Sequence, residues 1–247
     1  MLTLFRNTFG ESGGISISLK NGKHPCKFPR GLLSRHFNFF KERFNLPTME
    51  ATGDPTAETV ELPDVERRIF DLAIQMAITK SFQPHNSQTR TKKMEITTLL
   101  QLVILGTRLG FSGAGHIAAT RLKEILMDRR NALQESHIET AYTLGKGHPI
   151  RKVIVQSLGR AYFILKQGRA SKKQVYRRGE ADNARRNAFD GDKFIFQDQL
   201  DTIDDFNLEL SIQAIDILHD RNEITSRSGK TRTITYTDPL SEESFSL

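Results

Sequence analysis

The chain has 247 residues, a formal net charge of +7, 37% hydrophobic residues and a mean hydropathy of −0.44, which favours a compact part with polar loops or tails over one tight globule. The single cysteine, Cys26, excludes an internal disulfide, and no signal-like segment opens the chain. The longest apolar run, Leu99 to Leu105, is far shorter than the roughly 20 residues that span a bilayer, so we expect a cytosolic or nuclear protein without a membrane span.

Alternating apolar residues and an Asn-Gly turn predict a hairpin near the N-terminus. Ile15, Ile17 and Leu19 alternate with serines, the period-two pattern of a strand with one buried face. The dipeptide Asn21-Gly22 follows, and it is the strongest short hairpin signal because both central turn positions need positive φ. A return strand through residues 26–28 should then lead into one helix over residues 31–44.

A loop, a third strand and a helix are predicted next. Residues 45–58 hold prolines and polar groups typical of a loop, and Val60 and Leu62 indicate a strand. The next four apolar residues fall at i, i+3, i+4 and i+7, which predicts a helix: Ile69, Leu72, Ala73 and Met76. The polar segment Gln83 to Lys93 predicts an exposed loop without a structural role.

Helical patterns dominate the middle of the chain, whereas its last third is ambiguous. We expect helices over residues 96–109, 118–128, 137–144 and 150–165. Three apolar residues of the first of these helices should lie in the core: Leu99, Leu100 and Val103. Residues 208–218 mix alternation with helical spacing, and Thr231 to Thr237 predicts an isolated strand.

Three stretches together resemble the BTB/POZ family of protein-interaction domains. Phe28 to Phe40 is similar to the family's strand-into-helix segment, residues 60–65 to its third strand and turn, and residues 96–122 to its helical hairpin. Residues 136–153 look like the helical continuation of fungal members. The resemblance implies an α/β (α+β) fold in which a short three-stranded sheet is capped by a helical cluster, followed by an α-helical C-terminal extension.

The resemblance divides the chain and implies its partners. We expect a BTB/POZ-like domain over residues 11–128, a helical extension over 129–195 and a partly ordered acidic tail over 196–247. The implied function is that of a non-enzymatic adaptor that binds proteins through an apolar patch and groove rim. In such a family the apolar N-terminal residues can exchange between protomers, so Leu2, Leu4, Phe5 and Phe9 favour a weak dimer. The acidic motif with which some members engage a cullin scaffold is degenerate here, around Met49 and Glu50.

The cluster of phenylalanines in the helix predicted over residues 31–44 supplies one candidate partner-binding residue. Helical spacing places most of its rings in the core, and Phe39 is the one we expect to be exposed. With Met49 and Glu50, Phe39 completes the predicted partner-binding set.

No motif in the sequence supports catalysis, a cofactor or a metal. Residues 10–14 match Gly-x-Ser-x-Gly, but a nucleophile elbow needs a strand before the serine, and here a strand follows Ser12. Residues 113–118 match a dinucleotide fingerprint but follow a predicted helix instead of a strand. The seven histidines form no pair at i, i+4, and Cys26 is interpreted as a small buried hydrophobe.

The alternative function is nucleic-acid binding through the basic segment 151–193. Residues 151–198 carry 12 basic and 5 acidic side chains, while residues 199–247 carry 4 and 10. The basic patch consists of seven side chains: Arg169, Lys172, Lys173, Arg177, Arg178, Arg185 and Arg186. Only Tyr176 could stack on a base within this run, and the acidic block could neutralise it, so the sequence disfavours nucleic acid as the partner.

Overall fold

The computed structural model describes residues 14–20, 22, 25–45, 59–83, 91–170, 189–190, 193–225 and 232–246. These residues form a mixed α+β fold, as predicted, in two compact units. The first unit comprises Met1–Thr89 and Thr98–Ala118, and the second comprises Arg90–Thr97 and Ala119–Leu247. The division falls inside two helices, α5 (Lys92–Leu109) and α6 (Ala114–Asp128). The domain boundaries inferred from the resemblance stay a prediction.

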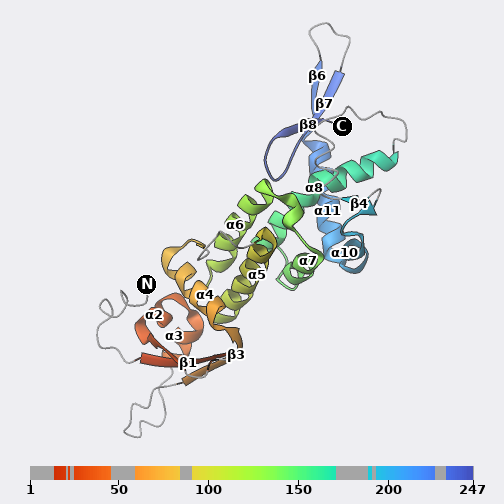
Figure 1. The fold of residues 1–247 in the computed structure, drawn as a ribbon. Helices are drawn as coiled ribbons and strands as arrows, with labels where there is room; N and C mark the ends of the chain where they lie inside the picture. Colours follow the sequence, from red (N-terminus) through yellow and green to blue (C-terminus); the bar gives the residue numbers. More distant parts are fainter. Residues whose placement is uncertain are drawn as a thin grey trace, which may run out of the picture. The chain divides into compact units, whose positions relative to one another are not determined.

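A three-stranded sheet is the base of the first unit. Its strands are β1 (Gly14–Lys20), β2 (Cys26–Pro29) and β3 (Thr59–Glu66), in the order β2-β1-β3. β1 runs antiparallel to β2 and parallel to β3 (Figure 1). Ile15, Ile17 and Leu19 are all buried, as predicted, but the strand is not buried on one face alone, because Ser16 on the opposite face is buried too.

Helices of the first unit bury the apolar residues that the sequence pattern placed in the core. They are α2 (Arg30–His36), α3 (Asn38–Asn45) and α4 (Arg67–Thr79), together with the parts of α5 and α6 that belong to this unit. Leu99, Leu100 and Val103 are at most 2% exposed, so their predicted core position is confirmed.

The single helix predicted over residues 31–44 is wrong, because the chain breaks at Phe37. Phe37 has extended dihedrals, φ −130° and ψ 117°, and separates α2 from α3. Its ring is buried and makes edge contacts with Phe40 and Phe111, with centroids 6.1 and 6.0 Å apart. A break at this position turns the ring into the core.

Glycines shape the turn between α5 and α6, where a dinucleotide fingerprint was rejected. Gly110 adopts φ +71°, which L side chains rarely adopt, and a Cβ there would lie 2.8 Å from Asn38 Cβ. The residues before the turn are helical in α5, so the prediction of a turn between two helices is confirmed. α5 begins at Lys92, and residues 84–90 of the predicted exposed loop lie outside the described residues.

The second unit combines helices with short strands. Its helices, besides parts of α5 and α6, are a 3₁₀ turn (Arg130–Ala132), α7 (Glu135–Tyr142), α8 (Pro149–Ala170), α10 (Gln197–Thr202) and α11 (Asp204–His219). β4 (Phe189–Asp190) pairs with β5 (Lys193–Phe194). The strands β6 (Asn222–Thr225), β7 (Arg232–Thr237) and β8 (Ser244–Ser246) form a sheet with β7 in the centre.

The strand predicted over Thr231 to Thr237 is therefore present, but it is not isolated. Its neighbours β6 and β8 span only four and three residues. Strands this short carry too few alternating positions to be recognised from sequence.

A buried histidine of the second unit gives a pH-dependent stability. Nδ1 of His137 accepts the backbone N–H of Gln134 at 3.2 Å, and Nε2 lies 2.9 Å from Thr97 Oγ1. Since Nδ1 is an acceptor, the neutral ring carries its proton on Nε2 and donates it to Thr97. Burial, and secondarily the charge of Lys93, lower the pKa of His137 to about 4.

We expect the protein to lose stability as pH falls from about 6.5 to about 4. In this range the unfolded imidazole binds a proton that the folded one does not, so protonation favours unfolding. The loss should be of order 1–3 kcal/mol. Urea unfolding of the wild type and His137→Gln at several pH values checks this, because the variant should lack that part of the slope. His116→Gln, at an exposed position, is the control.

Candidate interaction surface

The predicted partner-binding residues are only partly within the described chain. Phe39 is half-buried, and its ring meets Phe40 edge-on with centroids 5.1 Å apart. It is the most exposed ring of its cluster, as predicted, since Phe37, Phe40 and Phe44 are buried. Met49 and Glu50, like the N-terminal residues 2–9, lie outside the described residues. The structure therefore does not bring the predicted set together.

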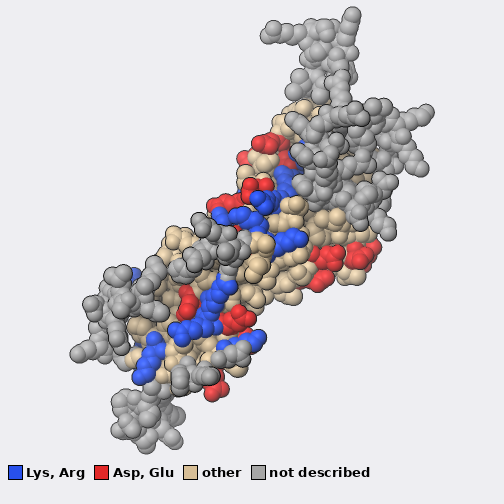
Figure 2. Space-filling view, viewed as in Figure 1, with Lys and Arg blue, Asp and Glu red and all other residues tan. Residues whose placement is uncertain are grey.

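The basic patch also falls largely outside the description. Arg169 lies in the last turn of α8, and the other six residues of the patch are outside the described residues. On the face drawn in Figure 2, Lys and Arg side chains lie next to Asp and Glu. Two arginines of the wider basic segment are described, and both pair inside the second unit: Arg151 with Asp205 and Glu209, and Arg160 with Asp238.

Catalytic and metal chemistry has little support among the described side chains. Cys26 is half-buried beside the core of the first unit, and Ser12 lies outside the described residues. Across residues 14–45, 59–83, 91–170 and 189–246, as far as these are described, no group of three His, Cys, Asp or Glu side chains could hold a metal ion. Within the same described segments, no helix is long and apolar enough to cross a membrane.

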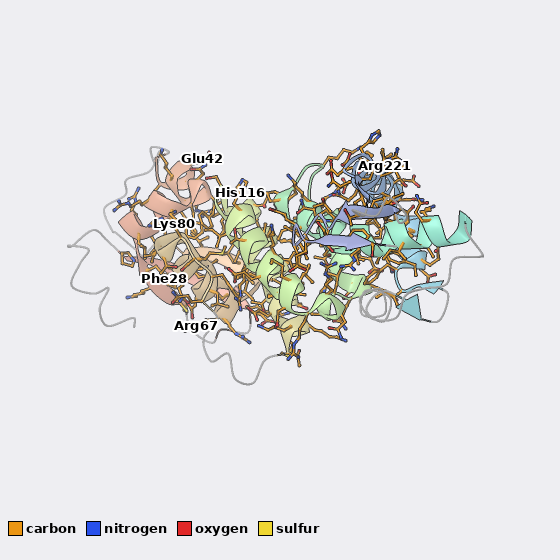
Figure 3. All side chains as sticks on the ribbon, turned by 90° about the horizontal axis from the view of Figure 1, so that it is seen from above. Phe28, Glu42, Arg67, Lys80, His116 and Arg221 are labelled. Atoms are coloured by element: carbon orange, nitrogen blue, oxygen red, sulfur yellow. The ribbon has the colours of Figure 1, made fainter. Side chains whose placement is uncertain are left out.

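An open groove lies along α4 in the first unit. Its cavity of about 370 Å³ is lined by Arg67, Arg68, Asp71, Leu72 and Gln75 (Arg67 is labelled in Figure 3). Arg67 Nε lies 3.6 Å from Asp71 Oδ2, and partial burial raises the pKa of Asp71 despite this pairing. The described lining carries two guanidinium groups, a carboxylate and an amide, so it offers charged and hydrogen-bonding groups to a ligand.

An exposed apolar face of α11, in the second unit, is a stronger candidate for an interaction surface than the groove on α4. The opposite face of α11 is buried, and this determines which residues are exposed. Phe206, Leu210 and Ile217 are buried where α11 packs on α8. The hydroxyl of Tyr162, on α8, lies 3.3 Å from Asn207 Oδ1 and 3.2 Å from Ser211 Oγ. These contacts determine which side of α11 points inward.

A buried ion-pair network fixes the start of α11. The Arg151 side chain, 4% exposed, places Nη2 at 2.6 Å from Glu209 Oε1 and 3.1 Å from Asp205 Oδ2. Tyr142 donates its hydroxyl to Glu209 Oε2 at 2.6 Å, and the Arg151 guanidinium lies 4.2 Å from the centre of the Tyr142 ring. Lys146 lies 3.1 Å from Asp205 Oδ1. A charged group buried this deeply needs such partners.

The titration behaviour of the network agrees with this geometry. Hydrogen bonds from Lys146 and Arg151 lower the pKa of Asp205. Burial, together with the hydrogen bond to the Glu209 carboxylate, raises the pKa of Tyr142, which stays a neutral donor. At neutral pH the network therefore holds α11 in one rotation about its axis.

That rotation leaves large apolar side chains in solvent. Eight such side chains are exposed among the described residues, and four of them form one face of α11, here called the α11 face: Leu208 (52%), Ile212 (50%), Ile215 (53%) and Leu218 (38%). They follow one another at i, i+4, i+7 and i+10, so they share one side of the helix. Clustered apolar exposure of this kind marks interaction sites, whereas single exposed residues do not.

Sequence reasoning missed this face although a signal for it was present. Residues 206–218 are apolar on two opposite sides of a helix. The apolar residues therefore do not repeat with a clear helical period, and part of the pattern is typical of a strand instead. Such a helix buries one apolar side in its own core and leaves the other exposed.

No family model matches this sequence, and no curated protein matches it. The class of the molecule therefore follows from its own structure, a mixed α+β protein with an exposed apolar helix face.

Proposed function

We propose that this protein is a non-enzymatic interaction module or adaptor, whose first unit is of the BTB/POZ type. The observation that carries the proposal is the α11 face, where four large side chains are each more than a third exposed. Covering apolar surface favours association, and what remains after the costs of association and ordering appears as affinity. The face is held rigidly by the Arg151 network, so little ordering cost opposes binding.

The BTB/POZ assignment has its support in the first unit. The element order there is hairpin, two short helices, third strand, helix and helical hairpin, with β1 between an antiparallel β2 and a parallel β3. Apart from the division of the first helix into α2 and α3, this sequence of elements is the one that the resemblance implies. The groove on α4 in this unit offers charged groups to which a partner can bind.

The adaptor proposal is tested by quantitative affinity purification with the intact chain. Proteins retained by the wild type should be lost with Ile212→Asp and kept with Ile104→Asp, which introduces the same charge at an exposed isoleucine of α5. Partners insensitive to Ile212→Asp would contradict binding through this face. Recovery of nucleic acid that is lost at raised salt would favour the alternative function instead.

A further inference from the structure

We propose that a second copy of this chain covers the α11 face, with the two α11 helices antiparallel across a twofold axis. The inference rests on the proposed function and deepens it by naming a partner. A twofold interface must be self-complementary, because the same patch is used by both protomers. The α11 face meets this condition in both its apolar residues and its charges.

The apolar side chains are spaced symmetrically about the middle of the helix. Leu208 and Ile215 lie seven residues apart, about 10 Å along the axis. In an antiparallel pair centred next to Ile212, Leu208 of one protomer meets Ile215 of the other, and the two copies of Ile212 meet near the axis. All three side chains are at least 50% exposed in the single chain.

The charges select the antiparallel orientation. Asp204 precedes Leu208 by four residues and His219 follows Ile215 by four, so both lie on the α11 face, at its opposite ends. Both residues are exposed. The antiparallel register places Asp204 opposite His219 of the second copy, whereas a parallel pair would place Asp204 opposite its own copy and incur like-charge repulsion.

Other charged residues near the face are compatible with this register. Asp216 lies on the flank and faces the neutral Asn207 of the second copy. Asp220 directly follows the helix, and at 3.6 residues per turn its position falls off the line of Leu208, Ile212 and Ile215. Arg221, labelled in Figure 3, comes directly after it. Asp205 is already paired with Lys146 and Arg151 within its own chain.

The size of the α11 face determines the affinity that we expect for the dimer. Leu208 to Leu218 covers about 15 Å of helix, which is small beside the roughly 800 Å² that each partner buries in a stable interface. We therefore expect a reversible dimer with a dissociation constant on the order of micromolar or weaker.

Sedimentation velocity of the intact protein over a wide concentration range tests the proposal. The wild type should shift from monomer to dimer, Ile212→Asp should remain monomeric, and Ile104→Asp should dimerise as the wild type does. His219→Lys, a substitution favourable at a helix C-terminus, should tighten the dimer about two- to fivefold by giving Asp204 a fixed cation.

Charge reversal tests the orientation. Asp204→Lys should weaken the dimer, and combining it with His219→Glu should restore it, because lysine then faces glutamate of the second copy. Asp220→Lys, off the face, is the matched control and should have no effect. Circular dichroism of each variant verifies that it is folded.

Two results would overturn the inference: a wild type that stays monomeric throughout, with no gain from His219→Lys, or a dimer that Ile212→Asp leaves intact. In either case, a bound protein whose recovery depends on Ile212 would preserve the adaptor proposal with a different partner. The two proposals can therefore fail separately.

Discussion

Replacing Arg151 with methionine is expected to lower the free energy of unfolding by about 3–5 kcal/mol. Methionine fills much of the volume of the buried arginine stem, but it removes the cation that pairs with Asp205 and Glu209 and lies over the Tyr142 ring. The cost arises mainly from the Glu209 carboxylate, which loses its cation and keeps only the hydrogen bond from Tyr142, and to a smaller extent from Asp205, which keeps Lys146. Chemical denaturation of the wild type and of Arg151→Met measures the change in the free energy of unfolding.

Two further variants identify the origin of this effect. Lys152→Met, on the next and exposed residue of α8, should change stability by less than about 0.5 kcal/mol. Adding Glu209→Gln to Arg151→Met should recover part of the loss, because one buried charge is removed with the other. If the double variant is less stable than Arg151→Met alone, charge compensation is not the reason for the loss.

The second large effect is expected at Asp238, whose replacement by alanine should also cost about 3–5 kcal/mol. Asp238 is fully buried, and its Oδ1 accepts the backbone N–H groups of Leu240 and Ser241 in the turn between β7 and β8. Its Oδ2 lies 2.8 Å from an Arg130 nitrogen and 3.7 Å from an Arg160 nitrogen. The Asp238 carboxylate therefore connects the turn between β7 and β8 to the guanidinium groups of Arg130 and Arg160.

Asparagine at this position separates the two roles. Asp238→Asn keeps an oxygen for the turn but loses the charge, so its cost should be smaller than that of alanine. Glu243→Gln, at an exposed position of the same turn, serves as the control. Hydrogen exchange of the β8 amides should rise in the alanine variant and stay low in the control. Unchanged exchange in the alanine variant would show that Asp238 does not hold β8.

Local patterns in the sequence predicted much of the first unit. Alternation at Ile15, Ile17 and Leu19 and the helical spacing of α4 each reflect a buried face, which period alone reveals. The break at Phe37 was missed because its cause is a ring contact with Phe111, 74 residues later, which no local pattern contains. The BTB/POZ type itself remains a proposal.

The candidate surface was harder to predict for the same reason. The pairs that orient α11 join residues far apart in sequence, such as Arg151 and Glu209, separated by 58 positions. Composition showed only that a basic block precedes an acidic one. The structure shows that Asp205 and Glu209 of the acidic block meet Arg151 and Lys146, and these pairs orient the helix that carries the exposed face.

Each compact unit is assembled from two separated stretches of chain, since the division falls inside α5 and again inside α6. During synthesis, the first unit cannot be completed until residue 118 has left the ribosome, and by then residues 90–97 of the second unit have already emerged. A gene fragment that ends at either crossing would cut a helix in half. Neither unit is therefore one continuous segment of sequence, and exchanging either of them between proteins would require cutting both α5 and α6.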